Sequence, residues 1–155
     1  MKFMILLKAD KNTEAGALPD EKLLAEMGKY NEELAKAGVL LAAEGLQPSS
    51  KGARVKLSGE KRTVTNGPFP ETTELIAGFW LFKVKSKEEA IEWVKRCPNP
   101  LHGEAEIEIR QMHEAADFGD ALTPQLKEAE RNTWPRRWPR TRSEDRNDNG
   151  NWQRT

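Results

Sequence analysis

Several carboxylate, amide and aromatic side chains lie near expected strand ends and in one proline-containing loop, where they could form a small-molecule site. Loops held on a rigid scaffold are where binding groups commonly gather. In such a pocket, Glu44 or Glu71 could act as a general acid or base with a raised pKa. Alternatively, Asn66 and Glu71 only hydrogen-bond the backbone of their own loop, because Asn-Gly is an effective turn sequence. The predicted binding residues are Glu44, Gln47, Asn66, Phe69, Glu71, Glu74 and Trp80.

The chain has two histidines, and one of them is a catalytic candidate. His102 lies in the sequence Pro-Leu-His-Gly, between the second expected helix and the last expected strand, and an imidazole titrates near neutral pH. The alternative for His102 is an ordinary solvated loop residue. His113 follows the last strand and is the weaker candidate. The two histidines form neither an HxH nor an HExxH spacing, so we predict no metal site.

Cofactor binding and cysteine chemistry find little support in the sequence. The chain contains neither GxGxxG nor GxxxxGK[ST], which are the usual signals of dinucleotide and P-loop binding, and we predict no cofactor. Cys97 stands at the end of an expected helix, where the negative end of the helix dipole opposes thiolate formation. We therefore expect Cys97 to be a packing residue.

The compartment is inferred from what the sequence lacks. A single cysteine excludes an internal disulfide and is compatible with a reducing cytoplasm. The first apolar run, residues 3–7, is too short for the core of a signal peptide. No later run approaches the roughly 20 apolar residues of a membrane span. We therefore expect a cytoplasmic protein of one domain with no membrane partner.

Charge is balanced over the chain but unevenly distributed along it. The 155 residues include 25 basic and 25 acidic ones, which does not indicate nucleic acid or an anionic membrane as a partner. From residue 131 onward, seven arginines face three acidic residues, a net of +4 that leaves −4 for residues 1–130. Residues 134–142 interleave tryptophan, proline and arginine, so they could stack on single-stranded nucleic acid or bind an acidic partner. We favour a solvated or self-docking tail instead, with nucleic acid not expected as a partner.

A regular α+β scaffold is predicted to position the candidate residues. Pro19 is expected in the first turn of a helix whose apolar stripe ends at Gly38, and Ser86 with Glu89 forms a capping box at the next helix. The order is βαββαβ with an inserted hairpin, a ferredoxin-like α+β arrangement with both helices on one face of an antiparallel sheet. The expected strands are residues 3–7, 39–43, 75–85 and 104–110, the hairpin joins 53–57 to 61–65, the helices cover 19–38 and 86–98, and a short helix covers 123–130.

The sheet pattern also predicts a second copy. Residues 3–7 are expected to be a central strand buried on both faces, and residues 75–85 to be the middle of the sheet. Trp80 and Phe82 are expected on the face that the helices leave bare. Such a face needs a cover, and a second copy of the chain is the simplest one. We therefore predict a homodimer.

Three motifs in a fixed order resemble those of the DGPF subgroup of the YciI-like proteins, the YCII-related family. The motifs are EGLQP at residues 44–48, VTNGPFPET at residues 64–72 and GFWL at residues 78–81. The resemblance covers roughly residues 1–114 and is followed by a helical extension, 115–131, and a basic tail, 132–155. It implies a dimeric α+β barrel with a pocket between the sheet and the loops. Members commonly have no assigned function, and many look like companions of extracytoplasmic-function sigma factors.

Two positions depart from that family pattern. Asn66 stands where the motif that names the subgroup has Asp, so an oxygen acceptor is kept but the charge is lost. The suspected catalytic pair of YciI is a His on the first helix and an Asp, and the first expected helix here contains no His. Asp10, just after the first strand, could match the acidic partner. The catalytic candidates are therefore Asp10, Glu71 and His102.

Two functions from different classes remain open. The first is a homodimer that binds a small polar or anionic metabolite beside the loop 66–74, with weak enzymatic activity as an extension. The second is a non-enzymatic partner module in transcriptional regulation, associated with a sigma factor and acting through the dimer surface or the tail. An enzyme needs a titratable group in a concave site, whereas a partner module needs an exposed apolar or charged patch.

Overall fold

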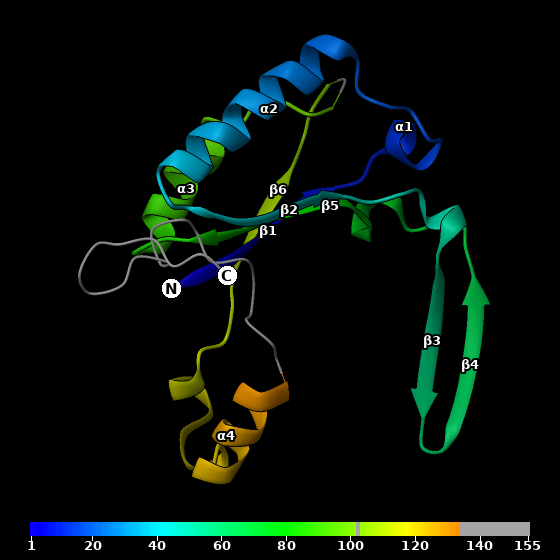
Figure 1. Cartoon of the computed structure of the whole chain (residues 1–155). Helices are drawn as coiled ribbons and strands as arrows, with labels where there is room; N and C mark the ends of the chain where they lie inside the picture. The colour runs from blue at the N-terminus through cyan, green and yellow to red at the C-terminus, as the bar shows by residue number, and fades with distance from the viewer. Residues whose placement is uncertain (102, 134–155) are drawn as a thin grey trace, which may run out of the picture.

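The main sheet has four antiparallel strands in the order β2-β5-β1-β6, in a computed structural model that describes residues 1–101 and 103–133. Its strands are β1 (Lys2–Lys8), β2 (Leu40–Gly45), β5 (Ile76–Lys83) and β6 (Ile107–Gln111). Helices α2 (Glu21–Lys36) and α3 (Lys87–Lys95) lie on one face of this sheet (Figure 1). This arrangement is consistent with the predicted ferredoxin-like α+β fold. The predictions for His102 and for residues 134–142 concern positions outside the described part of the chain.

The remaining elements are short and lie at the ends of the sheet or beyond it. Helix α1 follows β1 directly, and the two-stranded ladder of β3 and β4 separates β2 from β5 (Figure 1). None of the helices among the described residues is long and apolar enough to cross a membrane. These elements are α1 (Lys11–Glu14), η1 (Ser49–Lys51), β3 (Ala53–Ser58), β4 (Lys61–Asn66), η2 (Thr72–Glu74), η3 (Ala115–Ala121) and α4 (Pro124–Thr133).

The expected strands are present, with ends that differ from the predicted ones by up to three residues and with one difference in burial. Strand β5 lies between β2 and β1, which confirms its predicted place in the middle of the sheet. Strand β1 is not buried equally on both faces, because Phe3, Ile5 and Leu7 are buried while the residues between them are half-buried. Strand β6 begins three residues later than predicted. The reason is that β1 ends at Lys8, whose N–H donates to the carbonyl of Glu106, so nothing remains for residues 104 and 105 to pair with.

Helix α2 begins directly after a capping aspartate, and the proline predicted for its first turn lies before the helix. Asp20 is the N-cap, and its carboxylate accepts from the backbone N–H of Leu23 at 2.8 Å. Pro19 therefore precedes the helix instead of occupying its first turn. Gly38 ends the helix as predicted, with a φ of +71° that favours glycine.

Helix α3 has the predicted cap with one change of partner. The Ser86 hydroxyl accepts from the N–H of Glu89 at 3.1 Å, as expected. The Glu89 carboxylate, however, reaches one residue further back than predicted and accepts from the N–H of Lys85 at 2.8 Å. On the other helix, the Tyr30 hydroxyl donates to the carbonyl of Trp93 at 2.9 Å, which ties α2 to α3.

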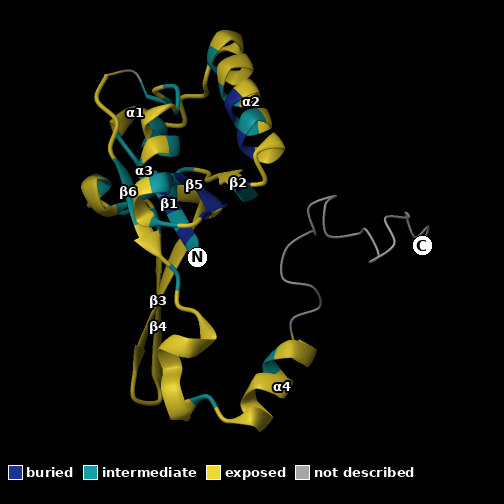
Figure 2. Ribbon diagram, turned by 90° about the vertical axis from the view of Figure 1, so that its left-hand side faces the viewer, coloured by how far each residue is buried: buried dark blue, intermediate teal, exposed yellow. Residues whose placement is uncertain are grey.

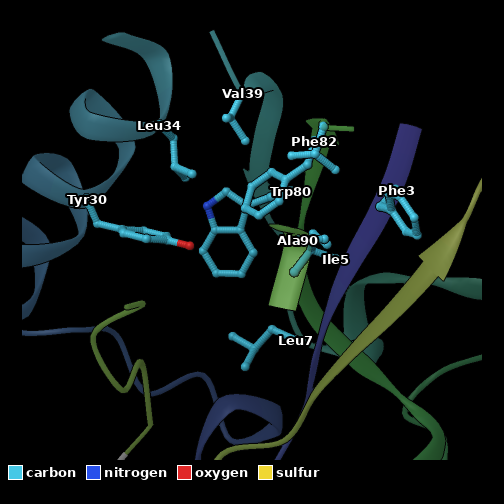
Figure 3. Close-up of a cluster of buried hydrophobic side chains, with 10 residues drawn as sticks. Phe3, Ile5, Leu7, Tyr30, Leu34, Val39, Trp80, Phe82 and Ala90 are labelled. Atoms are coloured by element: carbon cyan, nitrogen blue, oxygen red, sulfur yellow. The ribbon is translucent and has the colours of Figure 1, made fainter. Parts of the chain in front are cut away.

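The core lies between the sheet and the two helices (Figure 3). Trp80 meets the Tyr30 ring edge-on, with 6.4 Å between ring centroids, and its indole N–H donates to Asn31 Oδ1 at 2.9 Å. Phe82 is completely buried in the same cluster as Ala90 of α3. Trp80 and Phe82 therefore face the helices, and their predicted position on the bare face is wrong.

The face without helices carries a different set of apolar side chains, which we call the open face. By strand register Met4 lies opposite Leu81, and Leu6 lies opposite Phe79. Leu81 is buried, whereas the other three are half-buried. Among the described residues no helix packs on this side of the sheet (Figure 1). The open face consists of Met4, Leu6, Ala42, Phe79 and Leu81.

Two segments project from the sheet on the side of the open face (Figures 1 and 2). One is the ladder of β3 and β4, residues 53–66, which we call the arm and which is one residue longer on each strand than predicted. The other comprises η3 and α4, residues 115–133, which we call the extension. Its helix α4 begins as predicted, with the Thr123 hydroxyl accepting from the N–H of Leu126 at 3.3 Å.

Candidate functional site

A cavity of about 740 Å³ lies at the end of the sheet where β1 and β2 finish and β5 begins. Its lining comes from β1, α1, residues 15–19, α2, residues 43–48, η1, β5 and residues 100–101. Asn31 of α2 and Trp80, which are hydrogen-bonded to each other on the helix side of the sheet, both line it.

Most of the cavity lining is apolar. Pockets of roughly 300–1,000 Å³ with apolar walls and a few fixed polar groups are typical of small-molecule sites. Leu7 and Trp80 belong to both the cavity lining and the buried core, so part of the wall is rigid (Figure 3). The main apolar lining residues are Leu7, Leu18, Leu23, Leu24, Met27 and Trp80.

A few polar side chains line the same space. The Oδ1 atom of Asn31 accepts from the Trp80 indole, which fixes the amide and leaves its Nδ2 group able to donate to a ligand. Gln47 and Lys51 also line the cavity and are exposed. Among the described residues, Lys51 has no ion-pair partner. The carboxylates of Glu14 and Glu44 belong to the lining as well, so the site offers one positive charge, two amides and two carboxylates beside an apolar wall.

A junction of three segments fixes one side of the cavity. The carboxylate of Glu14 accepts from the backbone N–H of Ser49 at 3.1 Å and from its hydroxyl at 2.5 Å. The same hydroxyl accepts from the N–H of Phe69 at 3.0 Å. A Cβ atom on Gly67 would lie 1.7 Å from the Ser49 carbonyl oxygen, so only glycine fits there. Helix α1, η1 and the loop after β4 are thus held together, and the Gly67–Pro68 peptide bond within this loop is cis.

The structure divides the seven predicted binding residues into two groups. Glu44, Gln47 and Trp80 line the cavity. Glu44 pairs with Phe79 while Ala43 pairs with Trp80, so the Glu44 side chain points to the opposite face of the sheet from Trp80. The other four residues, Asn66, Phe69, Glu71 and Glu74, are not part of the cavity lining.

The second group lies around the base of the arm. The guanidinium of Arg54 bonds the Glu71 carboxylate at 3.0 Å and lies 4.0 Å from the centre of the Phe69 ring. The pKa of Glu71 is lowered by a hydrogen bond from its own backbone N–H and by the bond from Arg54. The expected raised pKa of Glu71 is therefore wrong, because the carboxylate is exposed and bonded to donors. Asn66 ends β4, and Glu74 is exposed in η2.

Asp10 has a capping role in the structure. Its carboxylate accepts from the N–H of Thr13 at 2.8 Å, and the Thr13 hydroxyl accepts from the N–H of Asp10 at 2.9 Å. The hydrogen bond from the Thr13 backbone lowers the pKa of Asp10. An ionised cap is a poor proton donor at neutral pH. His113 is exposed, with its Nδ1 atom 3.7 Å from a carboxylate oxygen of Asp117.

Two groups within the described part of the chain have raised pKa values, and neither is poised for catalysis. Burial raises the pKa of the Cys97 thiol to about 11, which keeps it protonated at neutral pH and agrees with a packing role. Burial also raises the pKa of Tyr30, whose hydroxyl is bonded to a backbone carbonyl. Within residues 1–101 and 103–133, no group of three His, Cys, Asp or Glu side chains is arranged to hold a metal ion.

Sequence reasoning missed Glu14, Asn31 and Lys51. Asn31 carried a signal, because it continues the four-residue spacing of Leu23 and Met27 and so places a polar group in an apolar stripe. Glu14 carried none, since its partner Ser49 is 35 residues away in sequence. Lys51 reaches the cavity only because η1 is folded against α1.

The comparisons with known proteins agree with the family that the sequence motifs indicate. An uncharacterised protein from Rhizobium meliloti (strain 1021) is 27% identical over 93 residues, which cover 60% of this chain and 75% of that protein. The family model of the YCII-related domain matches residues 1–113. This match includes both helices of the main layer, all four strands of the sheet and the whole cavity lining. The chain belongs to the YCII-related domain family.

Proposed function

We propose that this protein is a homodimer that binds a small molecule with an apolar body and an anionic group in the cavity beneath α2. The cavity itself carries the proposal, because its volume and mostly apolar wall match those of small-molecule sites. The site lies beside the loop 66–74 rather than within it. The junction of Glu14, Ser49 and Phe69 connects the loop to the cavity wall.

Among the charged and amide groups of the lining, Lys51 and Asn31 support an anionic group on the ligand. Glu14 and Glu44 oppose it, and the Glu14 carboxylate is already bonded to Ser49. Lys51 supplies a cation that no described carboxylate neutralises, and the Asn31 Nδ2 group supplies a fixed donor. An anion bonded to a charged donor gains more than a neutral acceptor does, typically about 1.5–3 kcal/mol against about 1. The apolar wall around Met27 and Leu7 supports a hydrocarbon or aromatic body.

Binding is better supported than turnover. The two described acidic candidates, Asp10 and Glu71, have lowered pKa values, are bonded to donors and do not line the cavity. A general acid that works at neutral pH needs a raised pKa and a place beside the substrate. Neither residue meets these needs, so the proposal assigns no catalytic role to them.

Dimerisation is supported by the open face. Met4, Leu6 and Phe79 are half-buried apolar side chains beside the fully buried Leu81, on a sheet whose described helices lie only on its other side. Large apolar faces of this kind usually mark an interface, and two-fold packing of identical faces is the commonest solution. Two such sheets packed face to face would give the dimeric barrel.

Ligand binding can be tested by calorimetry and thermal shift with a library of small carboxylates and phosphate esters that carry an apolar portion. A ligand of the native state raises apparent stability. We expect at least one to bind, and Lys51→Gln to weaken that binding about tenfold, which corresponds to the loss of one charged hydrogen bond. Lys22→Gln is the matched control, because Lys22 is exposed on α2 and does not line the cavity.

A second variant locates the site. Met27→Trp should fill part of the cavity and abolish binding while the protein remains folded. A ligand that binds Met27→Trp as well as wild type would sit elsewhere and contradict the proposal. If no compound binds at millimolar concentration, the alternative of a partner module in transcriptional regulation is favoured.

Dimerisation can be tested separately by sedimentation equilibrium. We expect a dimer at micromolar concentration, and Phe79→Ser should raise the dissociation constant at least tenfold because it removes apolar area from the open face. A wild-type protein that sediments only as a monomer would contradict this part of the proposal without affecting the cavity.

A further inference from the structure

The arm is an amphipathic ribbon whose apolar face is uncovered. Cross-strand register places Val55 opposite Val64 and Leu57 opposite Arg62, so the three apolar side chains share one face. They are 56%, 63% and 68% exposed for Val55, Val64 and Leu57. All 12 strand residues of the arm are exposed (Figure 2). An isolated two-stranded hairpin is marginally stable in water, so such a ribbon normally has a partner.

The base of the arm is fixed, which gives the ribbon a defined direction. Arg54 is held by Glu71 and by the Phe69 ring, and the N–H of Gly67 donates to the carbonyl of Gly52 at 2.9 Å. Gly67 also packs directly against the Ser49 backbone. The arm is therefore an ordered projection from the cavity end of the sheet. A surface held in one direction loses less conformational entropy on docking than a flexible loop does.

The charge of the arm indicates which kind of partner surface is complementary to it. Residues 53–66 contain four basic residues and one acidic residue, a net of +3. The rest of residues 1–130 contains 14 basic and 21 acidic residues, a net of −7. A basic ribbon on an acidic body is complementary to another copy of that body. By the same register, Arg62 shares the face of the three apolar side chains, whereas Arg54, Lys56 and Lys61 lie on the opposite face of the arm. An apolar face with one positive charge suits a protein surface better than a nucleic acid backbone.

The position of the arm agrees with this partner. The arm and the extension project to the side of the open face, on which a second copy would sit (Figures 1 and 2). The extension also exposes two large apolar side chains, with Phe118 51% and Leu126 52% accessible. A second copy seated on the open face would therefore lie between two projections that both carry uncovered apolar groups.

We propose that the arm of each copy packs its Val55, Leu57 and Val64 face onto the acidic body of the second copy, as a clasp outside the sheet-to-sheet interface. The inference rests on the proposed dimer. The clasp buries the apolar side chains of the arm and brings the basic arm to the acidic body. Without it, the dimer interface would consist of the open face alone. It also gives the arm the cover that it lacks in a single chain.

Photocrosslinking tests the contact directly on the full chain. A benzoylphenylalanine residue is introduced in place of Leu57, isotopically heavy and light copies are mixed, and crosslinked peptides are identified by mass spectrometry. The matched control carries the same group in place of Thr63, on the opposite face of the arm. We expect heavy-to-light crosslinks from position 57 to be at least fivefold more abundant than those from position 63.

Sedimentation equilibrium provides the second measurement. The triple variant Val55→Thr, Leu57→Thr, Val64→Thr places β-branched side chains, which suit strands, at all three positions and should raise the dimer dissociation constant at least tenfold. The control Thr63→Ser, Thr65→Ser on the opposite face should change it less than twofold. Because the altered residues lie outside the core, circular dichroism should show both variants folded.

The outcomes separate the clasp from the dimer. A wild-type dimer whose dissociation constant is unchanged in the triple variant would overturn the clasp and leave the proposed dimer intact. A monomeric wild type would overturn both. Crosslinks found only within one chain would also overturn the clasp. If the wild type bound a 20-base-pair DNA duplex and the triple variant did not, while the dimer dissociation constant was unchanged, the arm would be assigned to nucleic acid instead.

Discussion

Strands β6 and β3 have the same kind of sequence and opposite surroundings. Both alternate apolar with charged residues, as Ile-Glu-Ile-Arg in β6 and Ala-Arg-Val-Lys-Leu in β3. In β6, Ile107 and Ile109 pack against the buried core beside β1. In β3, Val55 and Leu57 are more than half exposed. Alternation therefore identifies a strand, whereas the partner strands and the helices above them decide whether its apolar face is buried.

The two regions should consequently contribute very differently to folding. Apolar burial contributes about 25 cal/mol per Å² removed from water, and the core side of the sheet has lost nearly all of its exposure. The apolar side chains of the arm have lost little of their exposure to water. We expect the free energy of unfolding of the single chain to reside in the sheet, α2 and α3, with the arm added at nearly no gain.

The largest expected effect comes from shortening a buried aliphatic side chain. Ile5 is fully buried and pairs with both Trp80 and Ile109, so Ile5→Ala should lower the free energy of unfolding by about 3 kcal/mol. The matched substitution in the arm, Leu57→Ala, should change it by less than about 0.5 kcal/mol in the monomer. Denaturant unfolding at low protein concentration measures both. Equal losses would show that the arm is part of the core.

A second effect tests the base of the arm, which is packed as tightly as the core. In Gly67→Ala the new methyl group would overlap the Ser49 carbonyl oxygen, so the backbone must move at an expected loss of about 2 kcal/mol. Gly28→Ala is the control, because its new methyl group would meet nothing within 4 Å in the helix α2. That control should stabilise the protein by up to about 1 kcal/mol. If Gly67→Ala left the free energy of unfolding unchanged, the junction around Ser49 would adapt to the added methyl group without cost.

The sequence predicted the elements better than their partners. Alternating and apolar runs identified every strand, and Gly38 and Ser86 marked helix boundaries correctly. The face to which Trp80 and Phe82 point was assigned wrongly, because a continuous apolar run such as β5 gives no preference between the two faces. Register with β1 and the contact with Asn31 decide it, and both depend on residues far away in sequence.

The cavity shows the same limit. Gln47 and Trp80 lie in sequence motifs and were identified as candidates, but motif membership also selected Glu71 and Asn66, which the fold places outside the cavity lining. The polar groups contributed by α1, α2 and η1 became neighbours only through tertiary packing. A short-range pattern could have indicated Asn31 within the apolar stripe of α2, but not the reach of Glu14 to Ser49.

A smaller effect concerns pH and the cap of α1 at the cavity. The pKa of Asp10 is lowered below its usual value of 3.8 by the hydrogen bond from Thr13, so the ionised cap stabilises the folded state. This stabilisation is complete above the unfolded pKa and is lost as the pH falls through the lower folded pKa. Asp10→Ala should cost about 1 kcal/mol at pH 7.

The pH dependence separates the cap from other effects of that substitution. The difference in unfolding free energy between wild type and Asp10→Ala should shrink as the pH is lowered from 6 to 2.5, and Asp20→Ala serves as the comparison cap at α2. A difference that stays constant over this range would show that charge on Asp10 does not matter. Such a result would leave only the loss of packing to explain the variant.

The smallest effect on the single chain is expected for the arm itself, and its dependence on concentration is informative. Val55→Thr, Leu57→Thr, Val64→Thr removes apolar atoms that are already in contact with water, so the melting temperature should match wild type within about 2 °C at concentrations where both are monomers. At high concentration the wild type should melt at a higher temperature than the variant, because dimerisation stabilises the folded state by mass action. A difference that persists at low concentration would mean that the arm is stabilised within its own chain, since only a contact between copies disappears on dilution.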